Sequence, residues 1–347
     1  MTKPIKLGFV GGGFVAQQCH LPCFSSIPDF NITHLADPYV DLRDKIAKKY
    51  DIPFVCDSHL SLLNESELDA VIVTLPRPLT FHVVQDLVLS DKSVLAEKPI
   101  CLNSSYGVSL LEKLQSRPVN SAVMTAYMKQ YDLGFLELKK LIAESDISEA
   151  ISLRGYCLMG NSYASPFGDI KGTKLKEIDY TKQSLPSWLP VELHWSFEQF
   201  INVFSHLTHS IEVLFDSQIK IKDVQLNKYG EGLILCSIQD IPLCLELMRG
   251  EQDEWLEGIA INFKSKQYEL KFPPAFLRNV PSKLTIRDGE TNSYEINIRP
   301  QWSWSFYEQA KAFSSFVRSS NHSHDDLSRA VRQISLAEMI YQMAFSL

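Results

Sequence analysis

Glu97 and Lys98 stand where an acid and an amine can take part in a reaction. They directly follow the apolar run 94–96, and Pro99 comes next. A lysine ammonium beside a reacting oxygen stabilises negative charge that develops there, and a proline holds the preceding residue in an extended backbone. The alternative is an ordinary strand end in solvent followed by a turn. These residues by themselves favour that alternative.

His206 is the second candidate for proton transfer. It lies in a helix expected over residues 198–215, where Asn202 precedes it by one turn and His209 follows by one turn. Side chains at these steps share a helix face, and a histidine there is a general base when a nearby ammonium suppresses its protonation. A buried structural histidine is one alternative. A metal site of Glu198, His206 and His209 is another, but one helix closes such a site poorly, and we expect no metal.

A glycine-rich loop, residues 11–16, follows the first expected strand, residues 5–10, and precedes a helix expected at 15–19. Its letters GGGFVA fit the pattern G-x-G-x-x-(G/A). The first glycine of that pattern allows a tight turn, the second lets a pyrophosphate approach the backbone, and the helix start offers N–H groups to the phosphates. The expected cofactor contacts in this loop are Gly11, Gly13, Phe14 and Val15.

Asp37 ends the second expected strand, residues 31–36. It lies roughly 20 residues beyond the glycine loop, the spacing at which a carboxylate binds the adenosine ribose of NAD. A carboxylate there repels the 2′-phosphate of NADP, so the sequence favours NAD over NADP. Asp37 also fits the N-cap of the next helix, a role compatible with ribose binding.

Strands and helices alternate over the first third of the chain. Further apolar strands are expected at 69–75 and 93–96, with amphipathic helices between strands, such as 40–50. This order predicts a parallel, doubly wound sheet with right-handed crossovers, whose ligands bind beyond the C-terminal ends of the strands. The further cofactor contacts expected at that edge are Thr74, Pro76, His82, Glu97 and Lys98.

The pattern changes after about residue 123. Helices are expected at 133–145, 198–215, 304–319 and 326–346, and a series of alternating segments runs from 219 to 298 without helices between them. Such a series indicates an antiparallel sheet with one open face. We therefore expect an α/β chain with an NAD-binding Rossmann domain at 1–124. The rest, 125–347, is expected to be an α+β domain for substrate binding and oligomerisation, with an open, mostly antiparallel sheet.

Composition limits the classes of partner. The chain has 347 residues, of which 45% are hydrophobic and 22% charged, and its net charge is -7. The negative charge disfavours nucleic acid, and no apolar run reaches the roughly 18 residues of a membrane span. Seven cysteines without paired spacing, and no export signal, favour the cytoplasm. The open sheet face predicts a homodimer or homotetramer.

Several motifs together resemble the Gfo/Idh/MocA oxidoreductases, named for glucose–fructose oxidoreductase, inositol dehydrogenase and a rhizopine-catabolism protein. They follow the family's order: GFVGGGFVAQQCHLP, LADPYVDLRDKIAKKY, VTLPRPLTFH, VLAEKPI and NVFSHLTH. The resemblance implies a Rossmann domain joined to an open-sheet domain, and oxidation of a sugar or cyclitol hydroxyl with NAD(P), or the reverse reduction. It also implies that Lys98 is the E-K-P lysine and His206 the acid/base histidine. Asn202 and His209 stand where the family often has aspartates.

We therefore predict a nicotinamide-dependent dehydrogenase of sugars, cyclitols or nucleotide sugars. His206 removes the hydroxyl proton, hydride leaves for the nicotinamide, and Lys98 binds the reacting oxygen. Asn202 orients His206 or the substrate but makes His206 a weaker base than an aspartate would. Tyr127 is a candidate substrate contact, with packing between the domains as the alternative. Two other classes stay open: a non-catalytic NAD-binding sensor or assembly subunit, and an NADP-dependent reductase of another carbonyl or imine.

Overall fold

The structure is a computed structural model that describes residues 3–117, 121–160, 184–251, 254–288, 294–296, 302–319 and 322–347. Its described residues fall into two compact units. The first is built mainly from Met1–Ala126 and Gln309–Ile334, and the second from Tyr127–Pro166, Trp188–Glu308 and Ser335–Leu347. The first segment of the first unit ends at Ala126, two residues after the boundary predicted at 124. The C-terminal helices contribute to both units. The roles assigned to the two domains stay predictions.

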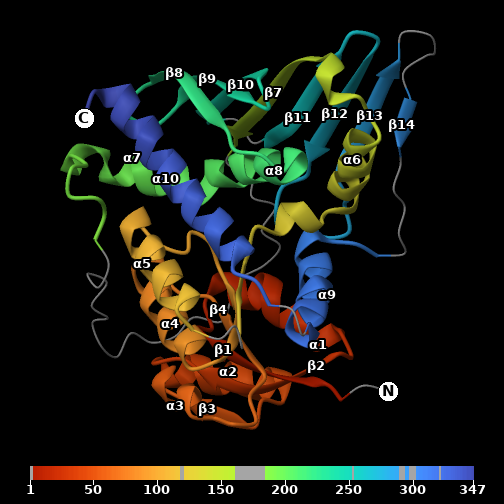
Figure 1. Cartoon of the computed structure of the whole chain (residues 1–347). Coiled ribbons are helices and arrows are strands. Elements are labelled where there is room, and N and C mark those ends of the chain that lie inside the picture. The colour runs from red at the N-terminus through yellow and green to blue at the C-terminus, as the bar shows by residue number, and fades with distance from the viewer. Residues whose placement is uncertain are drawn as a thin grey trace. The chain divides into compact units, whose positions relative to one another are not determined.

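A parallel sheet of six strands forms the centre of the first unit (Figure 1), in the order β3-β2-β1-β4-β5-β6. The strands are β1 (Ile5–Val10), β2 (Phe30–Ala36), β3 (Phe54–Cys56), β4 (Ala70–Val73), β5 (Ser93–Ala96) and β6 (Val123–Thr125). Every residue of β4 and β5 is buried, as expected for apolar parallel strands covered on both faces. The strand order reverses between β1 and β4, where open α/β sheets form their ligand crevice. The predicted Rossmann-like sheet is confirmed.

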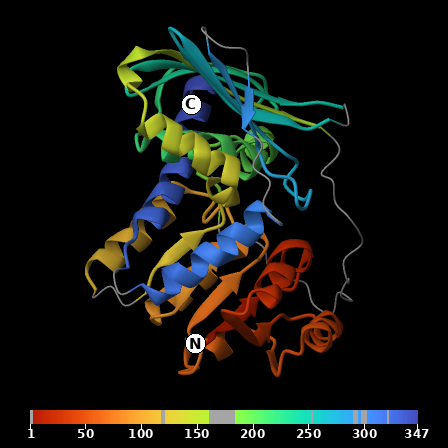
Figure 2. The same ribbon diagram turned by 90° about the vertical axis from the view of Figure 1, so that its right-hand side faces the viewer.

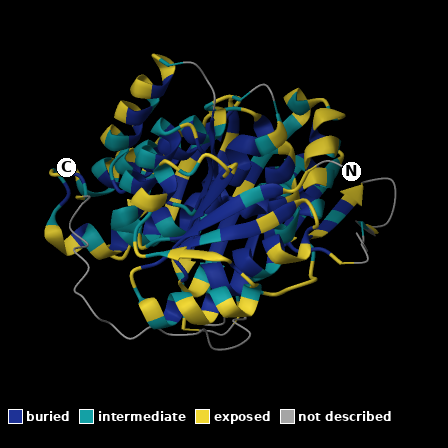
Figure 3. Ribbon diagram, turned by 90° about the horizontal axis from the view of Figure 1, so that it is seen from below, coloured by how far each residue is buried: buried dark blue, intermediate teal, exposed yellow. Residues whose placement is uncertain are grey.

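Helices cover this sheet, and Figure 3 shows exposed residues on their outer sides while the strands are largely buried. They are α1 (Leu21–Ser26), α2 (Val40–Tyr50), α3 (Leu60–Leu63), α4 (Arg77–Leu89) and α5 (Ser104–Gln115). Two later helices, α9 (Ser305–Arg318) and α10 (Asp325–Phe345), also contribute. Phe313 of α9 packs edge-on against Phe24 at 6.0 Å, and Asp326 of α10 accepts a 2.9 Å hydrogen bond from Thr125 Oγ1. These contacts explain why C-terminal residues belong to the first unit.

A mixed sheet of eight strands forms the second unit, in the order β14-β13-β12-β11-β7-β10-β9-β8. The strands are β7 (Ala150–Met159), β8 (Lys220–Leu226), β9 (Gly232–Ile238), β10 (Ile241–Arg249), β11 (Leu256–Phe263), β12 (Lys266–Phe272), β13 (Lys283–Asp288) and β14 (Tyr294–Ile296). Only β7 and β10 pair in parallel among the described strands of this sheet. The predicted open, mostly antiparallel sheet is confirmed. The parallel pairing of β7 with β10 was not predicted.

Two helices lie on one face of this sheet (Figure 2), with α6 (Leu133–Ala143) over β12 and β13 and α8 (Ser205–Phe215) over β7 and β11. The helix expected at 198–215 is longer than predicted. It comprises α7 (His194–Gln199), a π-helical turn at Phe200–Phe204, and α8. No helix in the described residues is both long and apolar enough to span a membrane.

Candidate functional site

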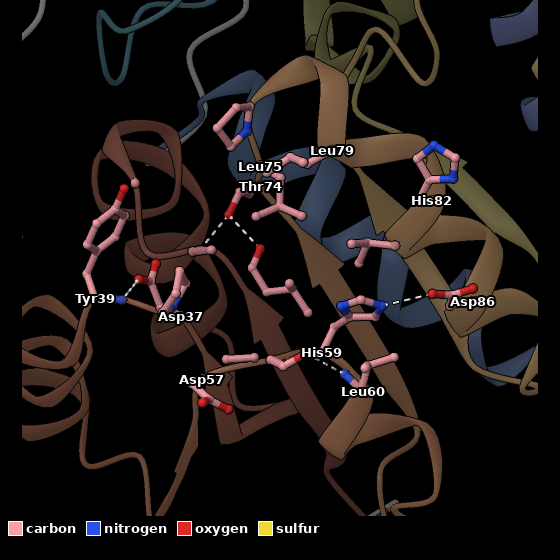
Figure 4. Close-up of a pocket in the computed structure, with 18 of the residues that line it drawn as sticks. Asp37, Tyr39, Asp57, His59, Leu60, Thr74, Leu75, Leu79, His82 and Asp86 are labelled. Carbon is pink, nitrogen blue, oxygen red and sulfur yellow. Dashed lines mark hydrogen bonds and ion pairs between the residues drawn. The ribbon is translucent and has the colours of Figure 1, made fainter. Parts of the chain in front are cut away.

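A cavity of ≈ 550 Å³ opens beyond the ends of β1, β2 and β4 in the first unit (Figure 4). Its volume lies within the range typical of small-molecule sites. Six residues predicted to contact a cofactor line it: Gly11, Gly13, Asp37, Thr74, Pro76 and His82. The other four predicted contacts, Phe14, Val15, Glu97 and Lys98, are not among its lining residues. The sheet therefore brings together residues that lie far apart in sequence, as parallel strand ends do.

The glycine loop forms one wall of the cavity with the backbone geometry that its sequence predicts. Gly11 has φ +92, and a Cβ there would lie 2.4 Å from Thr74 O, so a side chain is excluded. At Gly13 a Cβ would meet nothing within 4 Å, which leaves the backbone open to a ligand. Thr74 Oγ1 donates to Gly11 O at 2.7 Å, and Gln17 Nε2 donates to Gly12 O at 2.7 Å. The loop is thus held in place, with its open side available to a phosphate group.

Local structure after the loop differs from the expected α-helix. Phe14 and Val15 are helical, and a π-helical turn, Ala16–His20, follows them and leads into α1. The turn buries Gln17, whose side chain braces the loop, and His20. π-Helical segments occur mainly as single turns within α-helices, often at functional sites. The sequence motif gave no signal for Gln17, because the pattern ends at Ala16.

Asp37 is held rigidly at the edge of the cavity (Figure 4). Its Oδ2 accepts from Gly12 N and its Oδ1 from Tyr39 N, both at 2.8 Å. Burial raises the pKa of the Asp37 carboxyl, and these two N–H groups oppose the rise. A carboxylate has about four acceptor positions, so Asp37 can still accept hydrogen bonds from a ligand hydroxyl.

The far wall contains residues that the sequence did not point to. His59 Nε2 lies 3.0 Å from Asp86 Oδ2, and both line the cavity with Asp57 (Figure 4). Among the described residues that line the cavity there are three aspartates and neither lysine nor arginine. Such a wall suits neutral hydroxyl and amine groups better than a negatively charged phosphate group.

The turn after β5 fixes the Glu97 carboxylate. Glu97 N donates to Val73 O at 2.9 Å, which continues the parallel pairing past the strand. The Glu97 carboxylate forms a 2.8 Å hydrogen bond with His20 Nε2 and accepts a 3.2 Å bond from Lys98 N. Lys98 is half-buried, and its peptide bond to Pro99 is cis. His20 thus holds the Glu97 carboxylate at this turn.

In the second unit, Tyr127 lies against both histidines of α8. Its ring stacks on His209, with centroids 4.0 Å apart and planes 6° apart, and meets His206 edge-on at 5.5 Å. His206 is 9% exposed, whereas His209 is 1% exposed, so His206 is the more accessible of the two. Asn202 is half-buried in the π-helical turn that precedes α8. The structure thus brings the predicted residues Tyr127 and His206 together and gives His209 a stacking role.

Lys129 forms a buried ion pair with Glu257 in the same unit. Trp255 Nε1 donates to Glu257 Oε2 at 3.0 Å, and Lys129 Nζ lies 5.2 Å from the centre of the Phe272 ring. The ion pair joins the segment after β6 to the start of β11, a connection that no motif predicts. Within the described ranges, no three His, Cys, Asp or Glu side chains are grouped to hold a metal. Glu198, His206 and His209 do not form such a group.

Known proteins resemble this chain in sequence and fold. Residues 5–125 match the Gfo/Idh/MocA model, described as an oxidoreductase family with an NAD-binding Rossmann fold. Inositol 2-dehydrogenase of Klebsiella pneumoniae (strain 342) is 26% identical over 182 residues, which are 50% of this chain and 52% of that protein. The chain thus spans about half the length of the curated relatives it matches.

Solved structures extend the likeness over both units. KijD10, a 3-ketoreductase from Actinomadura kijaniata in complex with NADP and TDP-benzene, has a TM-score of 0.71 and 16% identity, and 98% of each chain is covered. The dehydrogenase MviM from Clostridium difficile has a TM-score of 0.73 and 18% identity, with 98% of this chain and 99% of that chain covered. At these identities the likeness concerns the fold.

Proposed function

Because residues 5–125 match the model of the Gfo/Idh/MocA oxidoreductase family, the family that the motifs resemble, we propose a function of hydride transfer. The chain transfers hydride between NAD(P) and a hydroxyl or keto carbon of a sugar, cyclitol or nucleotide sugar. The observation that carries the proposal is the cavity at the strand ends, with its open glycine loop and Asp37. The names of the inositol dehydrogenase and of the ketoreductase in complex with TDP-benzene support the substrate class.

The lining of the cavity fits a dinucleotide and favours NAD. The loop at Gly11 and Gly13, with the N–H groups of Phe14 and Val15, would hold the pyrophosphate. Asp37 would accept from the adenosine ribose, and Thr74, Pro76, His82 and Glu97 would complete the site. When bound, the nicotinamide supplies the carbon that exchanges hydride. KijD10 was solved with NADP. The three aspartates of this cavity disfavour the 2′-phosphate that distinguishes NADP from NAD.

Asp37→Ala is expected to lower the affinity for NAD by at least about tenfold, because a charged hydrogen bond to the ribose is lost. Affinity for NADP is expected to fall less or to rise, since the variant also lacks a charge that repels phosphate. Calorimetric titration with both dinucleotides checks this. In the unmodified protein, NAD affinity should decrease as the pH falls towards the raised pKa of Asp37, because the protonated carboxyl accepts less well.

Asp44→Ala is the matched control, since Asp44 is an exposed carboxylate on α2 outside the cavity. It should leave both affinities unchanged. Tight NADP binding with weak NAD binding in the unmodified protein would overturn the preference for NAD. If the ratio of NAD affinity to NADP affinity is unchanged in Asp37→Ala, Asp37 does not bind the adenosine ribose.

The proposed chemistry divides between two residues. His206 accepts the proton of the substrate hydroxyl, and the Lys98 ammonium stabilises the oxygen as charge develops on it. The hydrogen bonds of Glu97 with His20 and with Lys98 N support this role, because they hold the backbone from which the Lys98 side chain extends. Contact of Tyr127 with His206 supports a place for Tyr127 beside the substrate, together with Asn202.

A substrate screen tests the proposal. Sugars, cyclitols and nucleotide sugars are offered with NAD or NADP, and the absorbance of the reduced nicotinamide is followed. We expect at least one polyol to yield reduced cofactor. Stoichiometric NAD binding without any turnover would favour the sensor or assembly subunit instead. Oxidation of NADPH by an unrelated carbonyl or imine compound, with no activity on polyols, would favour the reductase.

The proposal extends to a homodimer or homotetramer in the cytoplasm. On the sheet face opposite α6 and α8, Leu233, Leu235 and Met248 are 45%, 48% and 40% exposed, while the alternate residues of β9 and β10 are largely buried. An apolar face of this kind is typical of an interface. All seven cysteines are free thiols, which supports a reducing compartment.

Leu235→Glu is expected to convert the oligomer to a monomer, because it places a charge in the proposed interface. Sedimentation velocity measures the change. Leu136→Glu, at a residue of α6 that is 46% exposed, should leave the assembly unchanged. A monomeric unmodified protein, or an assembly insensitive to Leu235→Glu, would contradict this interface.

A further inference from the structure

A second cavity, of ≈ 330 Å³, lies in the second unit and is lined by none of the residues assigned above. It opens where β7 and β10 end beside each other and where the β8–β9 hairpin turns. Its wall includes Trp195 of α7, Tyr229 of the hairpin and Arg249 at the end of β10. Gly250 N donates to Met159 O at 2.9 Å, which joins the two strand ends that form its floor.

Two aromatic side chains form exposed walls of this cavity. Trp195 is 57% exposed and Tyr229 is 49% exposed. Large aromatic rings are normally buried, because each removes much apolar surface from water. Exposed rings in a concave site provide flat apolar surfaces on which a ligand with a flat apolar face can stack. The C–H face of a pyranose ring has that shape.

Polar groups in the cavity are fixed in advance. The guanidinium of Arg249 stacks 4.3 Å from the centre of the Trp195 ring, and Arg249 Nη2 donates to Tyr229 O at 2.7 Å. Arg249 Nε lies 3.6 Å from Glu231 Oε1, and Glu231 Oε2 accepts from Asn227 Nδ2 at 3.0 Å. Long side chains held by several contacts lose little entropy when a ligand binds. They form a prepared set of donors and acceptors.

The charges in the cavity balance, which limits the class of ligand. Arg249 and Glu231 are its only charged lining residues in the described part of the chain, and they lie beside each other. A phosphate or carboxylate would compete with Glu231 for Arg249, whereas a neutral polyol can donate to the carboxylate and accept from the guanidinium. The amide of Gln199 adds a donor and an acceptor.

We propose that this cavity, named the Trp195 pocket, binds a neutral saccharide through one pyranose ring. The ring's C–H face stacks on Trp195 or Tyr229, and its hydroxyls bind Arg249, Glu231 and Gln199. The volume lies at the low end of the range for small-molecule sites, which suits a single sugar ring. This site is independent of the cofactor cavity and of hydride transfer.

Titration of the full-length protein with methyl β-D-glucopyranoside, methyl β-D-galactopyranoside and methyl α-D-mannopyranoside tests the proposal. Saturation-transfer NMR identifies which ring protons contact the protein. We expect at least one glycoside to bind with a dissociation constant of about 1–10 mM. Trp195→Ala should weaken this binding by at least about tenfold, and Trp195→Phe by less than about threefold, because phenylalanine keeps a stacking surface.

Two control variants separate this site from others. Tyr294→Ala removes an aromatic residue that is as exposed as Tyr229, on β14 outside the cavity, and should leave binding unchanged. Lys98→Met disables the proposed catalytic site and should also leave it unchanged. If Trp195→Ala proves unstable by thermal melting, Gln199→Ala and Glu231→Gln replace it, each with a severalfold expected loss. The proposal is overturned if no glycoside binds, or if binding survives these pocket substitutions.

Discussion

Replacement of Lys98 by methionine is expected to lower kcat by at least about 100-fold, while NAD affinity stays within about threefold of the unmodified value. Methionine keeps most of the side-chain length but lacks the ammonium that stabilises the substrate oxygen. The cavity proposed for the dinucleotide is lined by other residues, so cofactor binding should survive. Steady-state kinetics with a substrate from the screen, together with cofactor titration, measure both quantities.

Lys113→Met is the matched control for this prediction. Lys113 is an exposed lysine on α5 in the same unit, where it donates to Gln85 Oε1 at 3.3 Å. Its replacement should leave kcat unchanged. If kcat of Lys98→Met stays within about tenfold of the unmodified value, Lys98 does not take part in the catalytic step. A parallel loss of cofactor affinity would show that Lys98 acts in binding instead.

His206→Gln is expected to lower kcat by at least about 100-fold, because glutamine cannot take up the hydroxyl proton. The unmodified enzyme should also lose activity as the pH falls and His206 becomes protonated, and this acid limb should be absent from the variant's residual activity. The size of the amide and its position on α8 are compatible with the contact to Tyr127. A pH–rate profile for each protein checks the prediction.

Two other histidines serve as controls for His206. His194→Gln, at a half-buried residue of α7 whose Nε2 lies 3.2 Å from Leu189 O, should leave kcat unchanged. His209→Gln should lower thermal stability, because His209 is buried and stacks on Tyr127, while the acid limb of the profile remains. If His209→Gln removed the limb and His206→Gln did not, the base would be His209.

The sheet of the first unit could be predicted from the sequence because its strands are short apolar runs that end abruptly at a glycine or a polar residue. β1 ends at Val10, just before Gly11, and β5 ends at Ala96, just before Glu97. In a parallel sheet these ends share one edge, and six of the ten predicted cofactor contacts line the cavity there. The second sheet was predicted from alternation alone, although its central parallel pair, β7 and β10, was not.

Other parts of the site depend on contacts that no local pattern reveals. β3 is a three-residue strand without a buried residue, so its end was not predicted, and Asp57 and His59 were missed with it. The hydrogen bond of His20 with Glu97 links residues 77 positions apart. Lys129 and Glu257 are 128 positions apart. Such pairs form through tertiary packing, and one sequence alone does not specify them.

Direct transfer of deuterium from substrate to cofactor tests the central claim most directly. A polyol identified in the screen is labelled with deuterium on the carbon that is oxidised, and the reduced nicotinamide is analysed by mass spectrometry. Hydride transfer predicts one deuterium in the reduced cofactor, at a rate that falls at least about 100-fold in Lys98→Met and in His206→Gln. Reduced cofactor without deuterium, or no reduction with any polyol, would contradict the proposed function.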